Sequence, residues 1–114
     1  MQDSKRTTKY KPLVYICSPY SGNVEANTEK ARQYCRMAVD MGVIPIAPHL
    51  YFPQFMSEET ERDTAMLFNK VILSRCTQVW VFGDEVTRGM LQEIAYADRH
   101  GKTVRYFMED GKEI

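Results

Sequence analysis

The chain has 114 residues, a length that suits one domain able to bury roughly two-thirds of the surface that its unfolded form exposes. Lysine and arginine together number 15, as do aspartate and glutamate, so the overall charge favours neither a nucleic acid polymer nor a membrane as partner. No apolar run approaches the roughly 20 residues of a membrane span, and the polar N-terminus lacks a signal-peptide core, so we expect a cytoplasmic protein.

Residues 1–11 carry four basic side chains against one acidic one, and they are predicted to form a mobile leader to a single domain over residues 12–114. The three cysteines are Cys17, Cys35 and Cys76. They are odd in number, lack CxxC spacing and lie in apolar segments, which favours buried, reduced thiols. The two histidines are far apart in the sequence, so we expect no metal site.

The first half of the domain alternates strand and helix patterns. An apolar run over residues 13–17 predicts a buried strand, and the proline and glycine of residues 18–22 predict a loop after it. From about Val24 to Met41, apolar residues recur at three- and four-residue spacing, which predicts a helix that ends at a glycine. Residues 43–46 are predicted to form a second, short strand.

The stretch 47–55 is rich in proline and aromatic residues. It is too irregular for a helix or strand and too apolar for an ordinary solvated loop, so we expect it to cover part of the molecule. A second helix is predicted to follow, capped by Ser57 or Thr60 and ending near Arg75. The acidic residues expected in its first turn, where the helix dipole favours them, are Glu58, Glu59 and Glu61.

A third strand over residues 78–82, a third helix over residues 89–100 and a fourth strand over residues 103–107 complete the predicted order βαβαβαβ. Strands that alternate with helices of this length form a parallel sheet with right-handed crossovers and helices on both faces. The sequence therefore predicts an α/β fold of the flavodoxin-like (Rossmann-like) type, a three-layer sandwich with a small, mainly parallel sheet of four to five strands.

Two loops follow the carboxyl ends of predicted strands and are candidate sites for a phosphate or a sugar. The first loop supplies hydroxyl groups, an aromatic ring and a flexible glycine, namely Ser18, Tyr20, Ser21 and Gly22. It lacks the GxGxxG and P-loop patterns, which disfavours the usual dinucleotide and triphosphate sites. The alternative is that its serine and glycine residues only form a turn and a helix cap.

The second loop leads into the third helix with a hydroxyl, a guanidinium and a bare backbone, supplied by Thr87, Arg88 and Gly89. Glu93 follows one turn later, about 40° outside an apolar arc of the helix if each residue advances by about 100°. That arc comprises Met90, Leu91, Ile94, Ala95 and Ala97. The position suits a carboxylate at the rim of a cleft, but a glutamate that only stabilises the helix dipole would show the same pattern. Asp84 has a similar alternative, since turn residues often follow a strand.

Two motifs follow one another along the chain, the first around the end of the first predicted strand and the second in the third predicted helix. They are Tyr15-Ile16-Cys17-Ser18-Pro19-Tyr20-Ser21-Gly22 and Thr87-x-Gly89-x-x-x-Glu93-x-x-Tyr96-Ala97-x-x-x-Gly101-Lys102. They resemble the nucleoside 2-deoxyribosyltransferase superfamily, which also contains the 2'-deoxynucleoside 5'-phosphate N-hydrolases. The resemblance runs from about Leu13 to Phe107 and is closest to a little-characterised branch with segments like 48–50 and 82–84.

The resemblance implies that Glu93 is the nucleophile, a carboxylate that attacks the anomeric carbon of a deoxyribose and releases the base. A sugar that loses its base passes through an oxocarbenium-like state, which a nearby carboxylate can stabilise or capture. The resemblance also implies that Asp84 contacts the departing base and helps to protonate it. Thr87 takes the place of a serine that binds the 5'-phosphate in the hydrolases, and Tyr20 would line the sugar or phosphate site.

One departure from the family concerns the helix before the third strand, where the family usually has an aspartate that orients the nucleophile or the sugar. Spacing to the strand puts Asn69 there, and an amide cannot act as an acid. A second common aspartate is matched by Thr77, while Asp63 or a residue of a neighbouring subunit could compensate for the first loss. His49 lies among aromatic residues, so it either stacks on or bonds to a base, or has a structural or interface role.

We therefore expect a small-molecule nucleoside or nucleotide between the first and third βα loops, with no cofactor. The residues expected to contact it are Ser18, Tyr20, Ser21, Gly22, His49, Asn69, Thr87, Arg88, Gly89 and Met90, with Glu93 and Asp84 as the catalytic pair. The leading function is N-glycosidic cleavage or deoxyribosyl transfer. A non-catalytic nucleotide-binding or sequestering module is the rival, favoured by Asn69, and a purely structural interaction domain is a third possibility.

The segment 49–56, called the covering segment below, holds more apolar side chains than a small monomer usually exposes to water. The domain is also too small to enclose a nucleotide by itself. Because related enzymes form symmetric oligomers, we expect a homodimer or a higher homo-oligomer with the covering segment at or near the interface.

Overall fold

The computed structural model describes residues 10–114, so the predicted leader lies outside the described residues except for its last two positions. In chain order the elements are β1 (Leu13–Cys17), α2 (Val24–Asp40), β2 (Ile44–Ile46), the 3-10 helices η1 (Pro48–Leu50) and η2 (Phe52–Gln54), α3 (Arg62–Ser74), β3 (Gln78–Phe82), α4 (Arg88–Arg99) and β4 (Thr103–Phe107). Over residues 10–114, no helix combines the length and the apolar character needed to cross a membrane.

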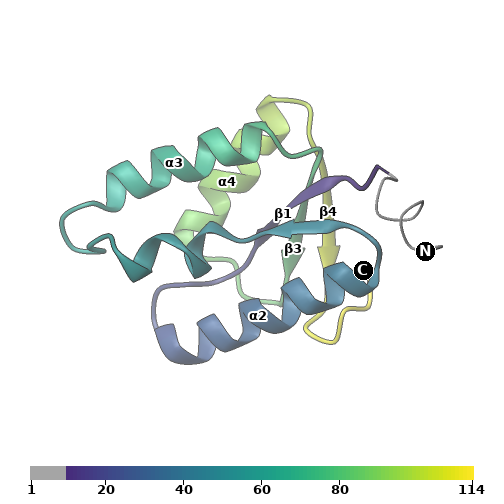
Figure 1. The fold of residues 1–114 in the computed structure, drawn as a ribbon, viewed down its shortest axis with the longest axis horizontal. Helices are drawn as coiled ribbons and strands as arrows, with labels where there is room; N and C mark the ends of the chain where they lie inside the picture. Colours follow the sequence, from purple (N-terminus) through teal and green to yellow (C-terminus); the bar gives the residue numbers. More distant parts are fainter. Residues whose placement is uncertain (1–9) are drawn as a thin grey trace, which may run out of the picture.

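The four strands form one sheet in the order β2-β1-β3-β4, and every neighbouring pair is parallel. This is the order in which a flavodoxin-like sheet begins, with its two halves diverging between β1 and β3. Helices α3 and α4 cover one face of the sheet, and α2 covers the other (Figure 1). The predicted fold class, a flavodoxin-like three-layer sandwich, is confirmed.

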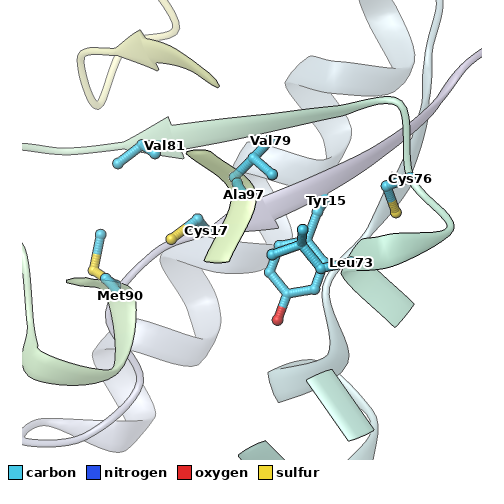
Figure 2. Packing of buried hydrophobic residues seen from close by; sticks show 8 residues of the cluster. All are labelled: Tyr15, Cys17, Leu73, Cys76, Val79, Val81, Met90 and Ala97. Atoms are coloured by element: carbon cyan, nitrogen blue, oxygen red, sulfur yellow. The ribbon is translucent and has the colours of Figure 1, made fainter. Parts of the chain in front are cut away.

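Each face of the sheet has its own core, because successive strand residues point to opposite sides. Tyr15 and Cys17 of β1 pack toward α3 and α4, whereas Val14 and Ile16 pack toward α2. Figure 2 shows the first core, whose fully buried side chains are Tyr15, Cys17, Leu73, Cys76, Val79, Val81, Met90 and Ala97. All three cysteines are free thiols, and Cys35 is only half-buried.

The second helix begins later than the sequence predicts. Ser57 Oγ accepts from the N–H of Thr60 at 3.3 Å, and the N–H of Ser57 donates to Glu61 Oε1 at 2.8 Å. These bonds close a separate turn that satisfies its own backbone, and α3 starts only at Arg62, without a side-chain cap. The predicted helix cap and the predicted first-turn glutamates are therefore wrong. The acidic residue in the first turn of α3 is Asp63.

The stretch before this turn contains two short helices, where the sequence analysis predicts no element. Pro48 stands at the first position of η1, and Pro53 lies at the second position of η2. Proline fixes φ near the helical value, which favours such short turns at their first residues. Phe52 and Phe55 then pack edge to face, with ring centroids 6.1 Å apart. The covering segment is therefore folded and built around its own aromatic cluster.

Candidate functional site

A cavity of about 280 Å³ lies at the carboxyl ends of β1 and β3. Its walls come from the β1–α2 loop, the covering segment, one face of α3 and the start of α4. The residues that line it are Ser18, Tyr20, Ser21, Pro48, His49, Phe52, Pro53, Met56, Ser57, Glu58, Arg62, Ala65, Met66, Asn69, Thr87, Gly89, Met90 and Glu93. Sheets of this topology bind ligands where the strand order reverses, and the volume lies near the lower end for small-molecule sites.

Glu93 forms part of the cavity wall and is only 8% exposed. It lies on the buried face of α4 together with Met90 and Ala97. The predicted apolar arc is wrong at Leu91, which is 58% exposed, and at Ala95, which also faces outward. The helix is therefore rotated so that its glutamate points inward, rather than lying at the edge of the buried face.

Three neutral donors hold the Glu93 carboxylate. The Tyr15 hydroxyl donates to Oε2 at 2.6 Å, the Asn69 amide donates to the same oxygen at 3.4 Å, and the Cys17 thiol donates to Oε1 at 3.5 Å. Burial raises the pKa of Glu93, and these hydrogen bonds offset part of that rise. The pKa values of Tyr15 and Cys17 are raised by burial and by the Glu93 charge, so both keep their protons.

Tyr15 and Cys17 are the functional residues that sequence reasoning missed, although both belong to the first motif. Their side chains share one face of β1, which Figure 2 shows together with Met90 of α4. The usable signal is the two-residue period of a strand, since both residues then face the helix that carries Glu93. A similar signal on α3 is the spacing of Arg62, Met66 and Asn69, which share the cavity-facing side of that helix.

Ser18 and His49 form a polar pair in the cavity wall, with 3.1 Å between Oγ and Nε2. Burial lowers the pKa of His49 to about 4, so its ring is neutral near pH 7. Tyr20 approaches this ring edge-on, with centroids 6.3 Å apart. Within residues 10–114, no three His, Cys, Asp or Glu side chains gather closely enough to hold a metal ion.

The start of α4 adds a capped helix end to the cavity. Thr87 is the N-cap residue, and its Oγ1 accepts from the N–H of Met90 at 3.3 Å. A Cβ at Gly89 would lie 3.9 Å from Arg62 Nη2, so the guanidinium of Arg62 stands beside the first turn of α4. The other end of that guanidinium, Nη1, is 3.1 Å from Glu58 Oε2.

Three of the predicted site residues do not line the cavity. Gly22 has a φ of +97° and shapes the turn before α2, a backbone conformation that glycine adopts readily. Arg88 and Asp84 are exposed. The pKa of Tyr34, which packs in the core on the opposite face of the sheet, is raised by burial, by the charge of Glu109 and least by that of Asp84. Among residues 10–114, the carboxylates that line the cavity are those of Glu58 and Glu93.

Comparison with known proteins places this geometry among related folds. No curated protein sequence matches the chain significantly. A solved structure of a 2-deoxyribosyltransferase from the psychrotolerant bacterium Bacillus psychrosaccharolyticus is similar, with a TM-score of 0.61 and 22% identity over 84% of this chain and 72% of that one. This likeness confirms the nucleoside 2-deoxyribosyltransferase-like fold. Residues 12–107 match the family described as a domain of unknown function, DUF7768. The chain therefore belongs to the DUF7768 family and has a 2-deoxyribosyltransferase-like fold.

Proposed function

We propose that the protein cleaves the N-glycosidic bond of a nucleoside or nucleotide, or transfers its deoxyribosyl group, with Glu93 as the nucleophile. The observation that carries this proposal is the buried Glu93 carboxylate, which faces a small cavity and is held by neutral donors alone among residues 10–114. A carboxylate without a cationic partner keeps its electron density available for an electrophilic carbon.

The hydrogen bonds favour one oxygen as the attacking atom. Oε2 accepts from both Tyr15 and Asn69, whereas Oε1 accepts only the weaker bond from the Cys17 thiol. Oε1 would form a bond to the anomeric carbon as the bond from carbon to the base breaks, and the base would leave with the electron pair. Water or a second base would then release the glycosyl ester and regenerate the carboxylate, as in retaining glycosidases.

The rest of the cavity wall offers chemistry that suits a nucleoside. Phe52, Pro53 and Met56 supply an apolar surface against which a base can pack. Ser18 and neutral His49 supply a hydroxyl and a ring nitrogen for hydrogen bonds to sugar hydroxyl groups. These groups support the proposal that the substrate is a small polar molecule with one flat, apolar part.

A 5'-phosphate is proposed to bind at the start of α4. Thr87 and the bare backbone of Gly89 lie there, as the sequence analysis expects, but the neighbouring guanidinium is that of Arg62. Helix N-termini attract anions through unpaired N–H groups and partial positive charge. We therefore assign the expected role of Arg88 in phosphate binding to Arg62.

The rival proposal is a module that binds a nucleotide without cleaving it, because Asn69 stands where related enzymes have an aspartate. The two proposals are separated by incubating the protein with deoxynucleosides and their monophosphates and measuring free base by chromatography. We expect the wild type to release base, and Glu93→Gln to bind substrate but turn over several orders of magnitude more slowly. Ligands that raise the melting temperature without any base release would instead support sequestration.

A further inference from the structure

The charged side chains of the cavity wall are few. Among residues 10–114 they are Glu58, Arg62 and Glu93, since His49 is neutral near pH 7. Arg62 is thus the cation that an incoming anion would meet, and it is already paired with Glu58 at 3.1 Å. With two carboxylates against one guanidinium, the charges of the cavity wall favour a 5'-monophosphate over the uncharged nucleoside less than Arg62 alone would.

We infer that Glu58 determines how strongly the site prefers a nucleoside 5'-monophosphate over the free nucleoside, by competing with the phosphate for Arg62. This inference rests on the proposed function of the same cavity. Glu58, expected from the sequence only to stabilise a helix dipole, thereby takes a role in specificity.

The geometry of the pair supports direct competition. One nitrogen of the Arg62 guanidinium contacts Glu58, and the other stands beside Gly89 at the start of α4. A phosphate bound at this helix end would therefore lie against the same guanidinium that Glu58 occupies. The pKa of Tyr20, another residue of the cavity wall, is raised by burial and to a smaller extent by the Glu58 charge.

The strength of the pair allows the phosphate to compete. Glu58 and Arg62 are four residues apart in the sequence, at the start of α3, and their side chains are 48% and 49% exposed. Exposed pairs of this kind change an equilibrium constant by only about fivefold or less. A phosphate that gains bonds to both the guanidinium and the helix end can displace the carboxylate, but it binds more weakly than it would without Glu58.

The test is a set of calorimetric titrations with a deoxynucleoside and its 5'-monophosphate, carried out on Glu93→Gln so that neither ligand is consumed. Adding Glu58→Gln is expected to tighten monophosphate binding about three- to fivefold and to change nucleoside binding by less than about twofold. Adding Arg62→Gln as well is expected to abolish that gain, because the two anions no longer share a cation.

Glu59→Gln is the matched control, because Glu59 is exposed, adjoins Glu58 and does not line the cavity. It removes the same charge and is expected to leave the ratio of the two affinities unchanged. The inference is overturned if Glu58→Gln and Glu59→Gln give equal ratios, or if Glu58→Gln weakens monophosphate binding. If the protein binds neither ligand, the proposed function fails together with the inference, whereas binding with an unchanged ratio refutes the inference alone.

Discussion

At the scale of single residues, Glu93 combines deep burial with a negative charge that no cation neutralises among residues 10–114. Burial of a carboxylate destabilises its ionised form, and hydrogen bonds from neutral groups recover only part of that free energy. Asn69 adds a second uncompensated group, because its buried Oδ1 has no hydrogen-bond partner within the described chain. A fold that retains both features sacrifices stability at this position, which is typical of functional sites.

Replacing Glu93 by glutamine is therefore expected to stabilise the fold near pH 7. The pKa of Glu93 is raised in the folded state, so the unfolded chain loses its proton first as the pH rises. For each unit by which folding raises the pKa of Glu93, the wild type loses about 1.4 kcal/mol of unfolding free energy relative to the variant. This loss is complete once the pH exceeds the pKa of Glu93 in the folded state.

Thermal unfolding followed by circular dichroism between pH 4 and pH 8 measures this difference. The two proteins should differ least at the acidic end, where the glutamate is mostly protonated in both states, and the advantage of Glu93→Gln should grow toward neutral pH. A difference that stays constant across this range would show that the pKa of Glu93 is not raised by folding.

At the scale of elements, the strands and helices were more predictable than the surfaces that they present. The strands at residues 78–82 and 103–107 coincide with their predicted bounds, because continuous apolar runs between turn signals define them. The start of α3 was not predictable, since the turn from Ser57 to Glu61 is closed by reciprocal side-chain bonds that imitate a helix cap. Because the sequence predicts too early a start for this helix, it does not show which side of α3 faces the cavity or that Arg62 lies on that side.

The placement of Arg62 leads to a prediction that compares it with Arg88, the other arginine near the start of α4. Arg62→Gln is expected to lose most of the preference for a 5'-monophosphate over the nucleoside, because a charge-assisted hydrogen bond contributes about 1.5–3 kcal/mol. Arg88→Gln serves as the control, since Arg88 is exposed and does not line the cavity. Calorimetric titration of both variants with the two ligands decides the assignment. If Arg88→Gln loses as much of the preference as Arg62→Gln, the assignment of phosphate binding to Arg62 in place of Arg88 is contradicted.

At the scale of the whole molecule, the sequence predicts the three layers and the flavodoxin-like fold. It also predicts a ligand site between the first and third βα loops, and the cavity is lined by residues of both loops. The sequence could not show that Leu91 faces outward while Glu93 faces inward, because hydrophobicity alone does not fix the rotation of a helix. Exposed apolar side chains gather on the covering segment and on α3, which are in contact through Phe52 and Phe68, with ring centroids 5.4 Å apart. The exposed side chains of this surface are Tyr51, Phe55, Leu67, Phe68 and Val71.

We predict that this surface mediates homo-oligomerisation, because a small domain rarely leaves so many large apolar side chains in water. The double variant Tyr51→Ser/Phe55→Ser should weaken self-association, since these side chains are 60% and 62% exposed. Val39→Ser is the control, because Val39 is an exposed residue of α2 on the other face of the sheet. Analytical ultracentrifugation that finds a monomeric wild type at tens of micromolar would contradict the prediction, as would an oligomer that the double variant leaves intact.

The most direct measurement of the central proposal is mass spectrometry of the protein quenched with acid during turnover of a deoxynucleoside or its monophosphate. The account predicts a peptide that contains Glu93 and has gained the mass of the deoxyribosyl group, with or without its phosphate, because the carboxylate forms an ester with the anomeric carbon. Glu93→Gln should show no adduct, and its base release should be several orders of magnitude slower than that of the wild type. Base release by the variant within about tenfold of the wild type, or an adduct on another residue, would contradict the assignment of Glu93 as the nucleophile.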